Sequence, residues 1–147
     1  MSRRIICIRN DVAELEHANQ EIGRYLKSEG LAHDLIQAVS LGVEEVVTNI
    51  LKYGYDDQRE HQIEITLRLE DSKLRLTIVD DGHEFNPLNQ AQPNLAKSLH
   101  EREPGGLGIL LLDNLFDKIQ YRRENEKNSL TLVKLIPRPL AQKYDGD

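Results

Sequence analysis

The stretch Leu41-Gly-Val-Glu-Glu-Val-Val-Thr-Asn-Ile-Leu-Lys-Tyr-Gly-Tyr55 predicts a helix with a broad apolar face and two polar residues beside it. Each helical residue advances about 100° around the axis. One face therefore collects the apolar residues Leu35, Val39, Val43, Val46, Val47 and Ile50. Glu45 and Asn49 lie four residues apart, on the flank of this stripe. Either they form a hydrogen bond at the rim of the core, or they are a carboxylate and a carboxamide placed for chemistry.

Composition indicates one soluble globular domain spanning residues 1–147. The chain is long enough to bury a core, and it is 39% hydrophobic and 30% charged. Its net charge of -6, with scattered Lys and Arg, argues against nucleic-acid binding. The single cysteine, Cys7, lies in an apolar run and is expected to be buried. No apolar run is long enough for a bilayer span or a signal peptide, so we expect a cytoplasmic protein.

The remaining periodicity predicts helices that alternate with hairpin-connected strands. An edge strand, Arg4–Arg9, comes first, and a helix opening at Asp11 and ending at Gly30 follows. The helix that contains the stretch quoted above begins at His33 and runs to about Gly54. The predicted hairpins are Gln62–Glu70 with Leu74–Asp80, and Ile119–Arg123 with Ser129–Ile136. This order predicts an α+β fold, a two-layer sandwich whose mixed, mostly antiparallel sheet has its helices on one face.

Two further polar features lie outside the regular pattern. Asp80 keeps the parity of Leu76 and Ile78, so its carboxylate should point toward the core, where it needs a hydrogen-bond partner. After it, residues 82–105 lose all periodicity, as expected of a lid. The lid ends in Pro104-Gly-Gly-Leu-Gly108 before an apolar helix, an arrangement that suits either a hinge or an anion site at the helix start.

In combination, these motifs resemble the ATP-binding domain shared by gyrase-type topoisomerases, sensor histidine kinases and mismatch-repair ATPases (the Bergerat fold). Within that superfamily the chain is most similar to the anti-sigma-factor serine/threonine kinases. The resemblance covers nearly the whole chain. It is carried by Glu45-Val-Val-Thr-Asn49, Val79-Asp-Asp-Gly-His-Glu-Phe-Asn-Pro87 and Gly106-Leu-Gly-Ile-Leu-Leu-Leu-Asp-Asn114.

The resemblance assigns roles to these residues. It implies that Glu45 is the general base and that Asn49 is the Mg²⁺ ligand. Asp80 would accept a hydrogen bond from the adenine amine, and Gly82 would let the base approach the backbone. The remaining nucleotide contacts that it implies come from the lid and the glycine motif: Phe85, Gly105, Gly106, Leu107, Gly108 and Ile109.

The implied activity is ATP-dependent phosphorylation of a small anti-sigma-factor antagonist on serine or threonine. The implied partners are that antagonist and a sigma factor, with a homodimer formed through the sheet or the N-terminal region. The alternative is a catalytically weak, ATP-gated protein-binding module of the same fold. Two departures bear on the transfer rate: Tyr53 replaces a common histidine, and Pro104 and Gly105 stand where a basic residue can precede the glycine motif. Arg102 or Lys97 would then supply the cation.

Overall fold

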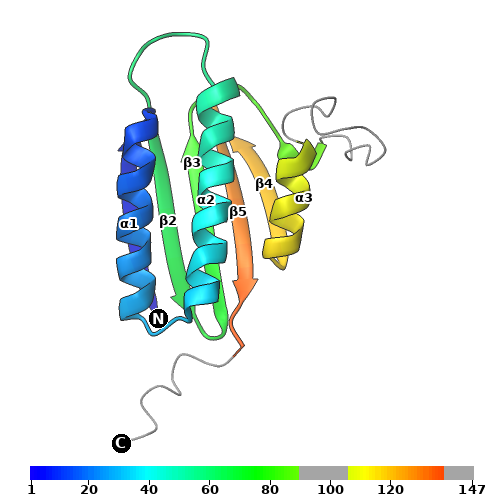
Figure 1. Cartoon of the computed structure of the whole chain (residues 1–147). Helices are drawn as coiled ribbons and strands as arrows, with labels where there is room; N and C mark the ends of the chain where they lie inside the picture. The colour runs from blue at the N-terminus through cyan, green and yellow to red at the C-terminus, as the bar shows by residue number, and fades with distance from the viewer. Residues whose placement is uncertain (90–105, 138–147) are drawn as a thin grey trace, which may run out of the picture.

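The computed structural model describes residues 1–89 and 106–137 and consists of two layers (Figure 1). Five strands form one sheet in the order β1-β2-β3-β5-β4. They are β1 (Ser2–Arg9), β2 (Gln62–Glu70), β3 (Lys73–Asp80), β4 (Lys118–Glu124) and β5 (Lys127–Leu135). Every pairing among them is antiparallel. The predicted α+β sandwich is therefore confirmed, with no parallel pair in the described sheet.

Three helices cover one face of this sheet: α1 (Val12–Ser28), α2 (His33–Tyr53) and α3 (Gly106–Leu115). A single turn of 3-10 helix, η1 (Pro87–Asn89), follows β3. The Asp11 carboxylate accepts a hydrogen bond from the Ala13 N–H (3.0 Å) and caps α1 as predicted. Gly30, with φ 86°, ends that helix in the left-handed conformation that favours glycine. Local sequence thus sets both ends of α1.

The core lies between the helices and the sheet. The core-facing residues of the central strands are fully buried, among them Ile63, Ile65, Leu67, Leu74 and Leu76, and they pack against the apolar face of α2. Gly42 lets α3 approach, because an added Cβ would meet the Phe116 ring at 2.5 Å. The opposite strand parity faces away from the helices, so Cys7 is exposed and its predicted burial was wrong. Its neighbours Ile6 and Ile8 are the inward residues.

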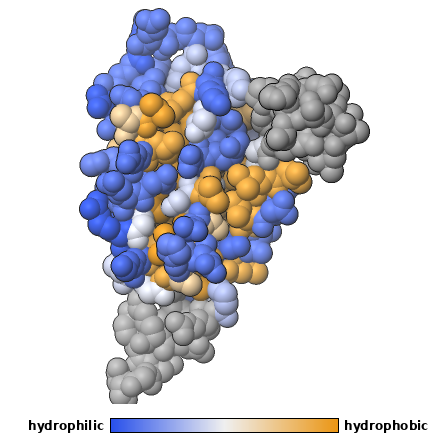
Figure 2. Space-filling view, viewed as in Figure 1, coloured by the Kyte–Doolittle hydropathy of each residue, from blue (hydrophilic) through white to orange (hydrophobic). Residues whose placement is uncertain are grey.

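The helical side has its own surface character. Figure 2 shows apolar side chains gathered over α3 and over the N-terminal part of α1, between hydrophilic areas. The exposed apolar residues of the three helices include Val12 on α1, Leu41 on α2 and Leu111 on α3. In the part of the chain that the structure describes, no helix is both long and apolar enough to cross a membrane.

Candidate functional site

The site begins at Asp80, the last residue of β3, whose side chain faces the helices as predicted. Asp80 is 5% exposed, and both hydrogen bonds that described residues donate to it end on Oδ1. The donors are the Gly82 N–H (2.8 Å) and Asn128 Nδ2 (3.0 Å). Burial raises the pKa of the Asp80 carboxyl, and these two hydrogen bonds oppose that rise. Its second oxygen, Oδ2, accepts no hydrogen bond from the described residues.

Asn128 is the residue that sequence reasoning missed. It is 6% exposed and lies opposite Asp80 in the β3–β5 register. Its Nδ2 also donates to the His83 carbonyl (2.7 Å), while its Oδ1 accepts from the Phe85 N–H (3.2 Å) and from the Tyr121 hydroxyl. Asn128 therefore ties the β3 carboxylate to the backbone that enters the loop after it. Its parity with Leu130 and Leu132 was the signal that could have revealed an inward side chain.

Helix α2 lies opposite Asp80 and contributes residues to the same pocket. Glu45 and Asn49 are half-buried, and Asn49 Nδ2 donates to Glu45 Oε1 at 3.3 Å. The hydrogen bond that the helix spacing predicted is thus present, and it turns Asn49 Oδ1 away from the carboxylate. Asn49 lines one pocket with Asp80, and Tyr53 lines it too. The remaining lining residues are Val46, Ile50, Gly54, Ile78, His83, Phe85, Pro87, Leu112, Tyr121, Asn128 and Leu130.

At Gly82 the backbone after β3 lies close to the C-terminus of α2. A Cβ at this position would lie 2.6 Å from the Gly54 carbonyl oxygen and 3.0 Å from Asp80 Oδ1. The Gly54 carbonyl also accepts a hydrogen bond from the His83 N–H (2.8 Å). Glycine is required here for this backbone approach, which holds the C-terminus of α2 against the end of β3.

Helix α3 brings the glycine motif to Glu45. A Cβ added at Gly108 would overlap the Glu45 carboxylate, so the helix start and the predicted base are in contact. Gly106 is the first residue of α3, and the side chain of Ile109 is buried in the core, so any ligand contact by Ile109 would use its backbone. Gly105, Arg102, Lys97 and most of the predicted lid lie outside the described residues, as does the Leu107 side chain.

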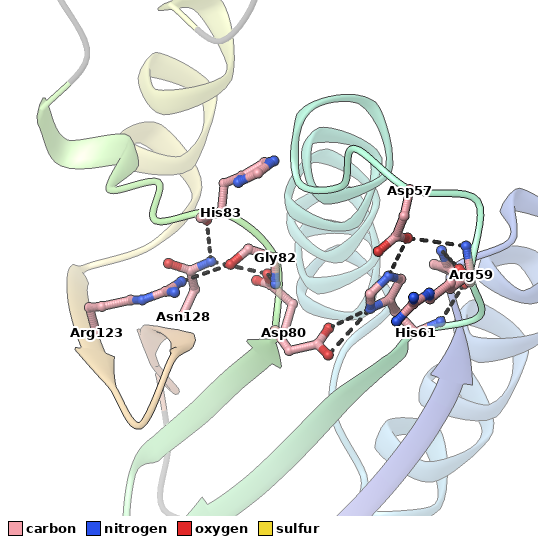
Figure 3. A network of polar contacts seen from close by, with 10 residues as sticks. Asp57, Arg59, His61, Asp80, Gly82, His83, Arg123 and Asn128 are labelled. Atoms are coloured by element: carbon pink, nitrogen blue, oxygen red, sulfur yellow. Dashed lines mark hydrogen bonds and ion pairs between the residues drawn. The ribbon is translucent and has the colours of Figure 1, made fainter.

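A second polar cluster flanks Gly82 on the side away from Asn128 (Figure 3). The His61 ring stacks on Tyr55 (centroids 4.1 Å apart) and contacts two carboxylates, Asp57 through Nε2 (2.7 Å) and Asp81 through Nδ1 (3.1 Å). The hydrogen bond to Asp57 and then that to Asp81 raise the pKa of His61, although burial opposes them. This cluster links the α2–β2 loop to the end of β3.

Arg123 holds the same turn from the opposite side. Its Nη1 donates to the Gly82 carbonyl at 2.8 Å, as Figure 3 shows. The guanidinium charge lowers the pKa of Asp80, a smaller effect than the burial that raises it. The turn after β3 is therefore fixed by side chains from β4, β5 and the α2–β2 loop.

Residues 8–134 match the family described as the histidine kinase-like ATPase domain. The chain is 31% identical to a serine/threonine-protein kinase, BtrW, from Bordetella bronchiseptica over 95 residues, 65% of this chain and 67% of that protein. It is 28% identical to the anti-sigma F factor of Oceanobacillus iheyensis over 65% of this chain and 66% of that protein. It is 30% identical to the anti-sigma F factor of Bacillus subtilis over 58% of this chain and 59% of that protein. The chain thus spans about two thirds or less of the length of these relatives.

Solved structures share the fold at lower sequence identity. The RsbU and RsbW domains of a Mycobacterium tuberculosis protein align over 95% of this chain and 33% of that chain, with a TM-score of 0.68 and 15% identity. The histidine kinase domain of a blue-light activated histidine kinase from Erythrobacter litoralis aligns over 89% of this chain and 61% of that chain, with a TM-score of 0.52 and 18% identity.

Proposed function

Because the chain belongs to the histidine kinase-like ATPase domain family, we propose that it is an ATP-dependent serine/threonine kinase and anti-sigma regulatory factor that phosphorylates a small antagonist protein. The observation that carries this proposal is the contact of Gly108 with Glu45, whose hydrogen-bond partner Asn49 lines the pocket that contains Asp80. It puts a carboxylate beside the helix start that would bind the phosphates of a nucleotide.

Adenine recognition is assigned to the Asp80 end of the pocket. The exocyclic amine of adenine is a donor, and Asp80 Oδ2 is an acceptor with no hydrogen bond from the described residues. A buried carboxylate without a second partner is costly, and an amine donor would offset that cost. Phe85 lines the same pocket and supplies an apolar wall. The pocket suits ATP better than GTP, whose carbonyl oxygen would face the carboxylate.

The phosphates are assigned to the start of α3. Backbone N–H groups of Gly105, Gly106, Leu107, Gly108 and Ile109 would supply donors at the positive end of the helix dipole. Asn49 would hold Mg²⁺ through Oδ1, a hard oxygen ligand that the Asn49–Glu45 hydrogen bond leaves facing outward. Among the described residues no three histidine, cysteine or acidic side chains form a metal cluster, so phosphate oxygens and water would complete the shell. Mg²⁺ would neutralise phosphate charge.

Glu45 is assigned to proton removal from the acceptor. In the transfer, the bond from the γ-phosphorus to the β–γ bridging oxygen breaks, a bond to the acceptor hydroxyl oxygen forms, and the hydroxyl proton goes to the Glu45 carboxylate. The proposed partners are the phosphorylated antagonist and a sigma factor, in the cytoplasm, with the kinase as a homodimer. Phosphate adds about two negative charges to the antagonist, and a kinase of net charge -6 would repel them.

Nucleotide titration with Mg²⁺ tests the pocket, and phosphate transfer to a purified antagonist tests the activity. We expect ATP to bind in preference to GTP, and Glu45→Gln to abolish transfer while leaving ATP affinity within about twofold. A loss of ATP binding in this variant would show that Glu45 binds rather than reacts. Tight ATP binding by the wild type without transfer to any antagonist would contradict the kinase proposal.

A further inference from the structure

One whole face of the sheet is free of helices in the described structure (Figure 1). It is formed by the strand residues that alternate with the core residues and point away from the helices. Thr66, Thr77 and Thr131 form a row across its centre. Thr77 and Thr131 share a hydrogen bond of 3.1 Å, so this row is uncharged and ordered. The charges of the face lie on either side of it.

The open face is basic although the chain is acidic. It carries eight of the chain's 19 Lys and Arg residues but three of its 25 Asp and Glu residues, a formal charge of +5 on a protein of net charge -6. The cations are Arg3, Arg9, Arg68, Lys73, Arg75, Lys118, Arg122 and Lys127, and the anions are Glu64, Glu70 and Glu124. The rest of the molecule therefore holds a large excess of negative charge.

Four of these cations form a row across the strands. The register places Arg3, Arg68, Arg75, Val133 and Lys118 side by side on β1, β2, β3, β5 and β4, and we call this set the basic row. No ion pair joins any cation of the basic row to another residue that the structure describes. Arg68 and Arg75 lie directly opposite each other, where like charges destabilise a sheet. Such a pair costs stability unless something acidic covers it.

We propose that the basic row is a docking surface for an acidic helix of a partner protein. Neighbouring strands lie about 4.8 Å apart, so the row spans about 19 Å. A helix presents side chains of one face once per 5.4 Å turn, on the order of the same spacing. A helix with a carboxylate on successive turns would meet the arginines in sequence.

Other occupants fit this face less well. A two-fold dimer through the open sheet would bring two faces of charge +5 together, so the proposed homodimer would form through the N-terminal region instead. Nucleic acid would meet Glu64 and Glu70 beside the arginines, and it would find no aromatic side chain on this face of the described strands for base stacking. Arginine is enriched at protein interfaces.

The test uses a fluorescein-labelled helical peptide of about 18 residues with glutamate once per turn on one face, long enough at 1.5 Å per residue to cover the row. Anisotropy at low ionic strength should show binding to the full chain that is lost when glutamine replaces glutamate. Arg68→Glu places opposite charges across the strands, so it should raise the melting temperature and yet weaken peptide binding about tenfold. The matched control, Arg24→Glu on the exposed side of α1, should leave binding unchanged.

Several results would overturn the proposal. The glutamine peptide could bind as tightly as the glutamate peptide, or Arg68→Glu and Arg24→Glu could lose peptide affinity equally. The glutamate peptide could also fail to bind at low ionic strength. Preference for a single-stranded oligonucleotide that Arg68→Glu abolishes would assign the face to nucleic acid. A dimer in sedimentation that the same variant dissociates would assign it to a second copy. Because the face lies across the sheet from the nucleotide pocket, ATP affinity should be unchanged throughout, which separates this proposal from the kinase proposal.

Discussion

Replacing Asn128 tests whether one missed side chain holds the pocket together. Asn128→Ala removes the Nδ2 donor from Asp80 Oδ1 (3.0 Å) and from the His83 carbonyl (2.7 Å), and the Oδ1 acceptor from the Phe85 N–H (3.2 Å) and the Tyr121 hydroxyl. A hydrogen bond to a charged group contributes about 1.5–3 kcal/mol, and a buried group left unpaired costs about 1–3 kcal/mol. Water can replace the partners nearer the surface.

We therefore expect Asn128→Ala to lower the free energy of unfolding by about 3 kcal/mol, or the melting temperature by about 10 °C. Urea denaturation with the slope checked against the wild type measures this loss. Tyr121→Phe is the matched control, because it removes one hydroxyl from the same cluster and should cost about 1 kcal/mol. If Asn128→Ala lowers the free energy of unfolding by less than Tyr121→Phe does, Asn128 is not the centre of the network.

Asn128→Asp extends the test to pH. It keeps the acceptor of Asn128 but sets a second carboxylate beside Asp80, so the pair should ionise fully only at an energetic cost. One carboxyl then has a folded pKa above its unfolded value. The destabilisation is present above that folded pKa and decreases as pH falls toward the unfolded one. Asn128→Asp should be less stable than Asn128→Ala at pH 7 and should recover stability near pH 5. If the two variants are equally stable at both pH values, the reasoning is contradicted.

Three further predictions concern this pocket and the His61 cluster beside it. Asp80→Asn should weaken ATP binding about 10- to 100-fold and, because a buried charge is removed, leave the unliganded protein at least as stable; calorimetric titration and thermal melting measure the two effects. Gly108→Ala should reduce phosphate transfer more than ATP affinity, because its Cβ overlaps the Glu45 carboxylate, while Gly23→Ala on α1, with no atom within 4 Å of its Cβ, should stabilise by about 0.5–1 kcal/mol. His61 gains stability from its two carboxylates below its unfolded pKa and loses it as pH rises through the raised folded pKa. Wild type should thus lose more stability between pH 6 and pH 8 than His61→Gln, and parallel melting curves would show that the ring contributes nothing.

Much of the fold was readable from local patterns. Helix α2 was predicted from His33 to about Gly54 and ends at Tyr53, and the Gln62–Glu70 strand has the bounds that were predicted for it. The inward direction of Asp80 followed from strand parity alone. These features depend on the 3.6- and two-residue periods, which neighbouring residues determine without reference to distant ones. The predicted burial of Cys7 was wrong because the whole apolar run was taken as buried. In an edge strand with one open face, successive side chains alternate between the core and that open face.

The sequence by itself determined the elements, their inward faces and the residues able to carry chemistry at the predicted site. Only the tertiary structure decided which of them meet: Asn128 with Asp80 across 48 residues, Gly108 with Glu45 across the α2–α3 contact, and four cations in one row across five strands. The physical reason is that strand order and register are set by global packing. A residue's own segment specifies the direction of its side chain, and the choice among possible neighbours depends on how all segments share one core.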